Sequence, residues 1–252
     1  MKLLNILLSY HFKLLEQKFL KFGIKIIGLK NIKYYEAKQL YILTERMFTR
    51  CKFLKNYITE IIIDDFDKLI NKGELDEKRF IAQGITFYPV KDNKIHIQIY
   101  LNINRTKEQK ARRLEVIKCP DSTYFETVLA HEYGHAIEVK LLELVNKWDV
   151  CEVDKNTVND YMYMKKIDDY IFESKEYDLI EICIKSLRSV VTQNGPLLSF
   201  AGEWLGVNAT INYQECFAES FAQYFCSDNP SLLSMKIVEK SLNKIDEMLK
   251  DR

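Results

Sequence analysis

A five-residue run near the middle of the chain, His131-Glu132-Tyr133-Gly134-His135, limits its possible local structure more than any other stretch. In a helix, residues four apart lie about one turn apart on the same face, so the two imidazoles can converge on one metal ion. Zinc binds neutral imidazole nitrogens, and a catalytic zinc keeps one of its four positions for water. Glu132 lies about 100° further around the helix, where it can reach that water as a general base. The run therefore predicts a metal-bearing helix.

The residues around this run favour a helix. Thr123 and Glu126 have the spacing of a capping box, which predicts a helix that begins near Tyr124. Gly134 lies inside this helix, where Gly costs about 1 kcal/mol relative to Ala. Close approach of another backbone is a reason for Gly at such a position. The alternative to a metal site is a pair of surface histidines on an ordinary helix.

Two histidines need a third protein ligand, and the chain has only two other histidines, His11 and His96. His96 lies upstream, not at the short HxxGxxH offset of three-histidine sites. A downstream helix predicted over 212–226 carries Glu215 and Glu219 on one face. Two carboxylates on such an apolar helix repel each other and lose solvation, unless a cation or a donor lies between them. A metal for Glu215 and the free N–H of a metal-bound histidine for Glu219 meet both needs. A pair of exposed or salt-bridged glutamates is the alternative.

The remaining pattern predicts one α+β domain with a small sheet ahead of the His131–His135 helix. Only 8 Gly and 4 Pro in 252 residues argue against a many-stranded all-β chain. Apolar and polar residues alternate strictly over Ile95–Asn102, which predicts a half-buried strand paired as a hairpin with 85–90 across a turn at 91–94. We further expect a strand at 57–64, polar connections over 64–80 and 102–120, and helices over 35–56, 151–195 (in two pieces) and 230–250.

Residues 1–30 predict a basic amphipathic helix ahead of a domain spanning 31–252. His11 and Lys13 interrupt the apolar run and no small-residue cleavage site follows, so the segment fails as a secretory signal. It is also too short and too charged to cross a bilayer. Packing onto its own domain is the favoured interpretation, with attachment to a membrane surface as the alternative. We expect a cytoplasmic protein, with export by an unconventional route as the alternative.

The charge balance and the cysteine content indicate which class of partner and which redox environment to expect. The 37 Lys and Arg nearly balance the 36 Asp and Glu, so bulk charge does not suggest nucleic acid as a partner. The six cysteines lack C-x-x-C spacing, which predicts reduced thiols. Cys216 and Cys226 lie on one predicted helix roughly 15 Å apart, too far for a disulfide.

The segments HEYGHAIE (131–138) and ECFAESFA (215–222) together resemble the gluzincins, zinc peptidases with an HExxH helix and a downstream glutamate helix. The chain is most similar to the group of the anthrax lethal factor catalytic domain, the Pro-Pro endopeptidases and related phage- or toxin-associated domains. The resemblance covers about 126–140 and 212–225. It implies a zincin-like fold with a C-terminal helical subdomain, and zinc-dependent cleavage of a protein or peptide. The implied roles are zinc ligation by His131, His135 and Glu215, base catalysis by Glu132, and support of a ligand by Glu219.

Two departures from this family pattern bear on activity. About 79 residues separate His135 from Glu215, which implies an inserted helical segment near 145–200. The family places an oxyanion-stabilising tyrosine about two helical turns before the ligand glutamate, where this chain has Asn208, and Tyr213 is the stand-in by proximity. The alternative function is therefore a catalytically weak zincin-like module with a structural or regulatory role in a phage or mobile element. In the peptidase interpretation, Ile95–Asn102 as a sheet edge would align an extended substrate by strand addition.

Overall fold

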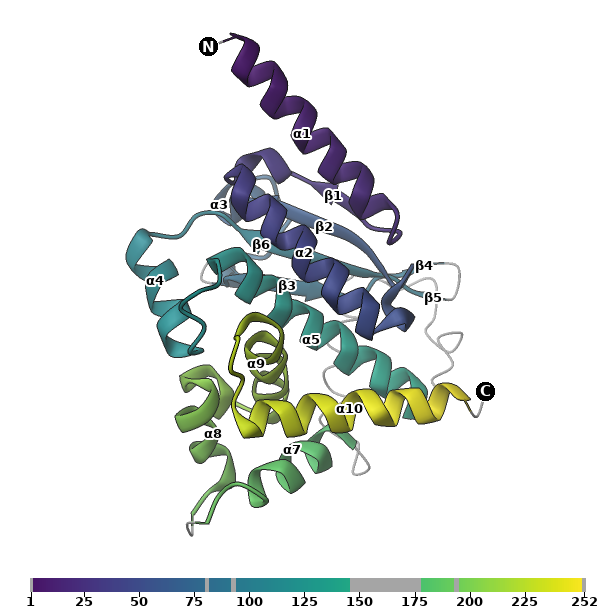
Figure 1. Ribbon diagram of the computed structural model, residues 1–252, viewed down its shortest axis with the longest axis vertical. Helices are drawn as coiled ribbons and strands as arrows, with labels where there is room; N and C mark the ends of the chain where they lie inside the picture. The colour runs from purple at the N-terminus through teal and green to yellow at the C-terminus, as the bar shows by residue number, and fades with distance from the viewer. Residues whose placement is uncertain (1, 80–81, 92–93, 146–177, 193–194, 251–252) are drawn as a thin grey trace.

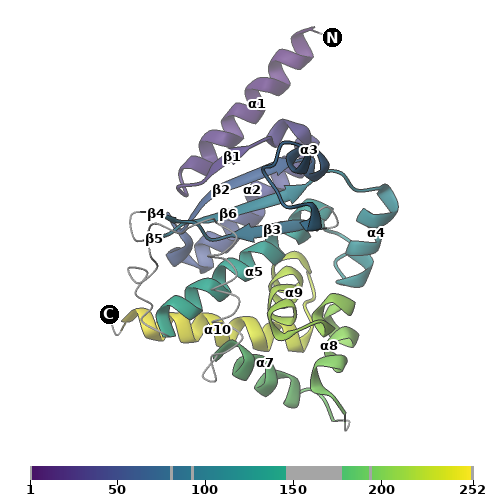
Figure 2. The same cartoon turned by 180° about the vertical axis from the view of Figure 1, so that it is seen from behind.

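The computed structural model describes residues 2–79, 82–91, 94–145, 178–192 and 195–250. It has the predicted α+β architecture, in which helices pack around one four-stranded mixed sheet (Figures 1 and 2). The strand order is β1 (Lys25–Ile27), β2 (Ile58–Asp64), β6 (Ile97–Asn102) and β3 (Gly84–Phe87). The first three strands are parallel, and β3 is antiparallel to β6.

The two central strands form over the segments with the predicted β-branched run (β2) and the predicted alternation (β6). In β6 the side chains of Ile97, Ile99 and Leu101 are fully buried, and Ile61 and Ile63 of β2 pack in the same core. The predicted hairpin is confirmed, because β3 pairs with β6 and the short strands β4 (Val90–Lys91) and β5 (Lys94–Ile95) extend it. Its turn includes residues 92–93, which lie outside the described residues.

One condition of the peptidase interpretation is not met. Ile95–Asn102 would have to form a sheet edge to align a substrate, but β6 lies between β2 and β3, and β3 is the outer strand. Strict alternation reports that a strand has one buried face, but it says nothing about how many neighbours the strand has. The number of neighbours depends on which distant segments pair, and this information is absent from the local pattern.

The long helices follow the predicted positions closely. α2 (Tyr34–Arg50), α9 (Tyr213–Cys226) and α10 (Leu232–Lys250) match three predicted helices, and α5 (Tyr124–Val145) begins at the predicted residue. The Thr123 N–H donates to Glu126 Oε2 at 2.8 Å, and the Glu126 N–H donates to Thr123 Oγ1 at 3.2 Å. These reciprocal bonds are the predicted capping box, and they set the start of the helix that carries both histidines.

Residues 1–30 are joined to the rest of the chain by a strand pairing and by core packing. β1 pairs with β2, and Phe12, Leu15 and Phe19 of α1 (Lys2–Leu20) lie in the main hydrophobic core. A three-residue strand with one buried side chain carries too weak an alternation to be predicted from sequence. The second half of α1 therefore packs onto its own domain, whereas its first half projects from the body (Figure 1).

Two helices lie where polar connections were expected, and a third follows the Gly195-Pro196 turn. Thr106 caps the start of α4, and its hydroxyl accepts from the Gln109 N–H in a second capping box. The predicted helices over 151–195 fall mainly on residues outside the described ones, and the described part of that stretch contains α7. The bounds are α3 (Phe66–Asn71), α4 (Lys107–Val116), α7 (Asp178–Arg188), α8 (Leu197–Leu205) and the 3-10 turns η1 (Leu29–Asn31), η2 (Lys52–Leu54), η3 (Glu77–Arg79) and η5 (Val207–Thr210).

The described cysteines are free thiols, as predicted, and Cys216 and Cys226 share helix α9. Cys151 lies outside the described residues. Among the helices that the structure describes, none has the length and apolar character needed to cross a bilayer.

Candidate metal centre

The site forms where α5 and α9 cross. A Cβ atom added at Gly134 would lie only 2.8 Å from Ala218 Cα and 3.3 Å from its carbonyl oxygen. The two backbones therefore approach more closely than any larger residue at position 134 permits, as the sequence predicted for Gly134. Because His131 and His135 flank Gly134 on α5, and Glu215 and Glu219 flank Ala218 on α9, the crossing brings these two pairs of side chains together.

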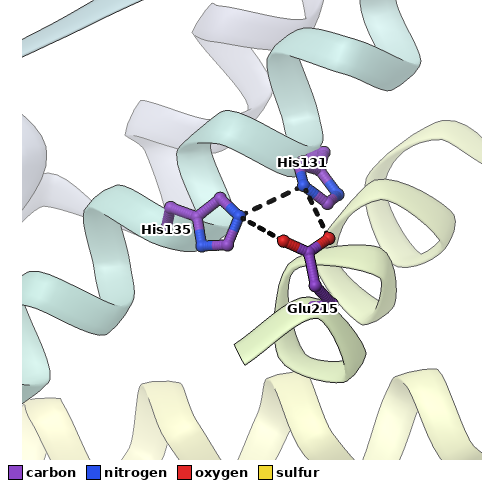
Figure 3. A group of neighbouring side chains, drawn as sticks. All are labelled: His131, His135 and Glu215. Carbon is purple, nitrogen blue, oxygen red and sulfur yellow. Dashed lines mark hydrogen bonds and ion pairs between the residues drawn. The ribbon is translucent and has the colours of Figure 1, made fainter. Parts of the chain in front are cut away.

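Three of these side chains point toward one another (Figure 3). His131 Nε2 lies 3.1 Å from His135 Nε2 and 3.5 Å from Glu215 Oε2, and His135 Nε2 lies 3.7 Å from Glu215 Oε1. Donors at the usual zinc distance around a tetrahedral centre are about 3.3 Å apart. Two imidazole nitrogens and a carboxylate at this spacing are a donor set that fits one divalent ion.

The far nitrogen of His135 contacts a carboxylate on its own helix. His135 Nδ1 lies 3.0 Å from Glu138 Oε2, one turn further along α5. Burial by itself lowers the pKa of His135, but Glu138, Glu215 and Glu132 outweigh that effect and raise its pKa to about 10. Glu138 thus orients the ring so that Nε2 faces the other donors, and in the absence of a metal it favours a protonated imidazole.

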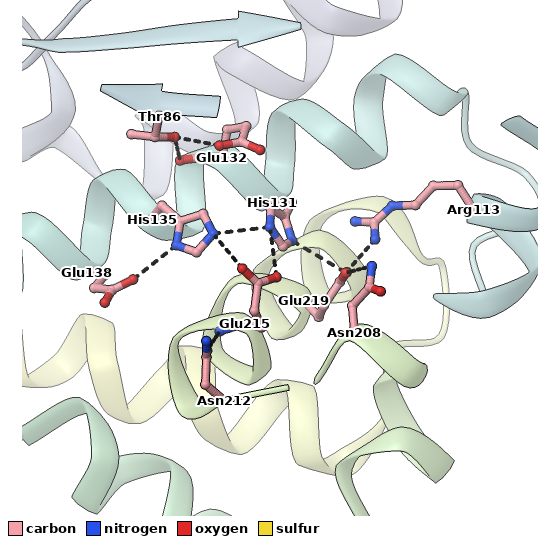
Figure 4. A network of polar contacts seen from close by, with 10 residues as sticks. All are labelled: Thr86, Arg113, His131, Glu132, His135, Glu138, Asn208, Asn212, Glu215 and Glu219. Atoms are coloured by element: carbon pink, nitrogen blue, oxygen red, sulfur yellow. Dashed lines mark hydrogen bonds and ion pairs between the residues drawn. The ribbon is translucent and has the colours of Figure 1, made fainter. Parts of the chain in front are cut away.

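The far nitrogen of His131 faces a carboxylate from a different helix. His131 Nδ1 lies 3.5 Å from Glu219 Oε1, and that oxygen also accepts from Arg113 Nη1 of α4 and, at 3.1 Å, from Asn208 Nδ2 of η5 (Figure 4). Glu219 is fully buried. Burial raises the pKa of its carboxyl, but Arg113 and His131 outweigh that effect and hold its pKa well below the usual range. Glu219 is therefore ionised, and its charge is compensated inside the protein.

Glu215 is placed by the first turn of α9. The Glu215 N–H donates to Asn212 Oδ1 at 2.7 Å, so Asn212 caps α9 three residues before Glu215. The Glu215 side chain is 28 % exposed, whereas that of Glu219 is completely buried. The two carboxylates of one helix face thus differ: one borders open space, and the other is enclosed.

Glu132 lies beside this donor set at the edge of the sheet. Its Oε2 accepts from Thr86 Oγ1 of β3 at 2.7 Å (Figure 4). A Cβ atom at Gly84, also in β3, would lie 2.6 Å from Glu132 Oε1, so the absence of a side chain there leaves room for the carboxylate. The outer strand of the sheet therefore donates a hydrogen bond to Glu132 and leaves space for its carboxylate.

Two adjoining cavities of about 210 and 480 Å³ open onto the site. Both are lined by His131, Glu132 and Glu215, and by Gly84 of the outer strand. The first extends past His135 and Tyr88, and the second past Lys78, Asn208 and Ile211. Solvent can therefore reach the donor set from both cavities.

The structure brings together all but one of the predicted site residues. Tyr213, the predicted stand-in for the oxyanion donor, lines neither cavity, and it packs against the hydrophobic core at the start of α9. Asn208, at the offset where the family that the sequence resembles has tyrosine, lines the larger cavity and contacts Glu219. Proximity in sequence to Glu215 was therefore a poor guide, because residues two apart on a helix point about 200° apart.

Four residues at the site were missed by the sequence analysis. Glu138 had a signal, since it follows His135 by three residues and so lies on the same helix face. The helix that carries Arg113 also had a sequence signal, because Thr106 and Gln109 have the spacing of a capping box. Thr86 had no local signal, because only the fold brings it to Glu132, and the family offset that pointed to Asn208 did not predict its contact with Glu219.

In comparisons with known proteins, no family model, no curated protein and no solved structure matches this chain. The site must therefore be interpreted from its own geometry.

Proposed function

We propose that this protein is a zinc-dependent endopeptidase with a zincin-like domain. The observation that carries the proposal is the convergence of His131, His135 and Glu215 beside a fourth, separately held side chain, Glu132. Two imidazoles and one carboxylate are the protein ligands of zinc in known metallopeptidases. The same donors accept other divalent ions, so the identity of the metal is part of the proposal.

Glu132 is the proposed general base. A bound zinc ion supplies Lewis-acid polarisation of a substrate carbonyl and lowers the pKa of water. Glu132 takes the proton of the attacking water and later delivers it to the leaving amine. Thr86 donates to Oε2 of Glu132 at 2.7 Å, which holds the carboxylate at one oxygen and leaves Oε1, beside Gly84, for proton transfer.

The outer strand β3 is the proposed guide for the substrate. Gly84, Ile85 and Thr86 line the smaller cavity, and β3 pairs with β6 along its other edge. An extended peptide that adds to this strand by backbone hydrogen bonds would pass beside Glu132 and the three metal ligands. This role replaces the one expected for Ile95–Asn102.

A catalytically weak module is the alternative, and one observation favours it. Tyr213 is absent from both cavities, so the proposed oxyanion donor is missing from its expected place. Loss of one such donor typically costs about 2.7–4 kcal/mol of transition-state stabilisation. A protein of this kind would bind metal and peptide but turn over slowly, as expected of a structural or regulatory role in a phage or mobile element.

Metal analysis and peptide cleavage by the full chain test the proposal. We expect about one zinc per chain in the wild type, near-complete loss in Glu215→Ala, and partial loss in Glu219→Ala. Glu132→Gln should keep the metal but abolish cleavage of a peptide library, while Glu143→Gln, on the same helix but outside both cavities, keeps both. Equal metal retention in Glu215→Ala and Glu219→Ala would remove the ligand assignment. Metal binding without any cleavage by the wild type would favour the alternative.

A further inference from the structure

Exposed apolar side chains gather at the N-terminal end of the molecule. Of the twelve large hydrophobic residues that are exposed in the described part of the chain, eight lie between residues 6 and 35. Ile6, Leu7 and Tyr10 of α1 are 66 %, 56 % and 58 % exposed. Monomeric proteins rarely leave such a group of large apolar side chains in water, so their clustering marks a contact surface.

These residues form a stripe on α1 opposite its buried face. At 100° per residue, Ile6, Leu7, Tyr10 and Leu14 fall within about 100° of the helix circumference. Phe12, Leu15 and Phe19 cluster on the other side, where they enter the protein core. The helix thus has two apolar faces, and only one of them is covered by described residues. Figures 1 and 2 show that α1 projects from the end of the molecule farthest from α7 and α8.

Positive charge gathers at the same end. The first 56 residues carry 12 Lys and Arg against 3 Asp and Glu, a net charge of +9, whereas the other 196 carry 25 against 33, a net charge of −8. The near-neutral total therefore hides a strong asymmetry. Lys13, Lys21 and Lys30 are exposed, and none of them makes an ion pair with a described residue. A partner for this end must accept both apolar side chains and cations.

We propose that α1 docks onto an anionic membrane surface, with the stripe of Ile6, Leu7, Tyr10 and Leu14 in the headgroup region and the surrounding lysines against acidic lipids. An amphipathic helix that lies in the interface combines these features, because burial of apolar side chains and attraction to anionic headgroups act together. Long lysine side chains can reach the headgroups while the helix lies flat. Nucleic acid would satisfy the charge but not the apolar stripe.

Flotation of the full chain with lipid vesicles tests this proposal. The wild type should bind vesicles that contain phosphatidylserine, should bind pure phosphatidylcholine vesicles weakly, and should dissociate as salt is added. Leu7→Gln/Leu14→Gln should weaken binding at least about tenfold, because two apolar side chains no longer enter the interface. The matched control is Leu232→Gln/Leu249→Gln, which changes two leucines of similar exposure in α10 and should bind like the wild type. Thermal unfolding of both variants checks that they fold.

Three results would overturn the proposal. The first is failure of the wild type to bind anionic vesicles. The second is binding that Leu7→Gln/Leu14→Gln leaves unchanged. The third is a concentration-dependent dimer in sedimentation experiments that this variant abolishes, without vesicle binding by the wild type, because the stripe would then be covered by a second copy. None of these readouts depends on metal or peptidase activity, so the proposal stands or falls separately from the proposed function.

Discussion

The two histidines of the candidate metal centre are supported in different ways. On one side, His135 contacts Glu138 from the next turn of the same helix, and the His135 side chain is 19 % exposed. On the other side, His131 faces Glu219, which is enclosed by Arg113 and Asn208 from two further elements. The first support comes from the same helix and lines the smaller cavity, whereas the second is assembled from segments up to 106 residues apart.

This difference separates contacts that act mainly on metal binding from contacts that also stabilise the fold. Glu138 is also buried, but its partner His135 becomes neutral when it releases its proton, so loss of Glu138 leaves no permanent charge without compensation. Glu219 and Arg113 form a buried ion pair, and removal of one partner leaves a charge without compensation in the interior. The His131 side should therefore tie metal binding to folding stability more strongly than the His135 side.

The largest effect is expected from Arg113→Met. The substitution leaves the buried Glu219 carboxylate without its cation, so the free energy of unfolding of the metal-free protein should fall by about 3–5 kcal/mol. Urea denaturation measures this change. Arg50→Met is the control, because Arg50 pairs with Asp246 at the surface, and it should cost less than about 1 kcal/mol. Equal losses in the two variants would contradict the proposed role of the buried pair.

The next effect is the pH dependence of metal binding. Since the pKa of His135 is raised to about 10 in the metal-free protein, a proton must leave before Nε2 can bind a metal. Zinc affinity should therefore rise roughly tenfold per pH unit, or about a hundredfold from pH 6 to pH 8. Titration against a chromophoric chelator measures the affinity, and calorimetry in two buffers counts the released proton. An affinity that stays flat over this range would show that His135 is already neutral.

A smaller effect is expected from Glu138→Gln. Loss of the carboxylate weakens the orientation and basicity of His135, so zinc affinity should fall by about ten- to a hundredfold. The free energy of unfolding of the metal-free protein should change far less than in Arg113→Met. Glu143→Gln is the control, because Glu143 pairs with Lys140 away from the donors. If Glu138→Gln destabilised the protein as much as Arg113→Met, the two sides of the centre would not differ as argued.

The smallest effect is expected from Asn208→Ala. Glu219 keeps its contact with Arg113, so the loss of one hydrogen bond should cost about 1 kcal/mol of unfolding free energy. Asn229→Ala, at an exposed position after α9, should change stability by less than 0.5 kcal/mol or so. Thermal and urea unfolding of both variants give the comparison. A loss as large as that of Arg113→Met would make Asn208, rather than Arg113, the main support of Glu219.

The sequence predicted those parts of the site whose geometry is set within one helix. The spacing of His131 and His135, the capping box at Thr123, and the shared face of Glu215 and Glu219 all follow from a repeat of 3.6 residues per turn. Gly134 also carried information, because a helix accepts its cost where another backbone comes close. Because Glu138 follows His135 by three residues on the same helix, its contact with His135 could also have been predicted from the sequence.

Other features required the tertiary structure. The position of β3 as the outer strand, the pairing of β1 with β2, and the contact of Arg113 with Glu219 join segments far apart in the chain. Tyr213 shows the reverse case, since a neighbour of Glu215 in sequence turns away from the cleft. Periodicity and capping are local properties, whereas strand order and buried ion pairs depend on which distant surfaces meet. Sequence alone therefore determined which helices carry the donors, and only the fold decided what lies behind each donor.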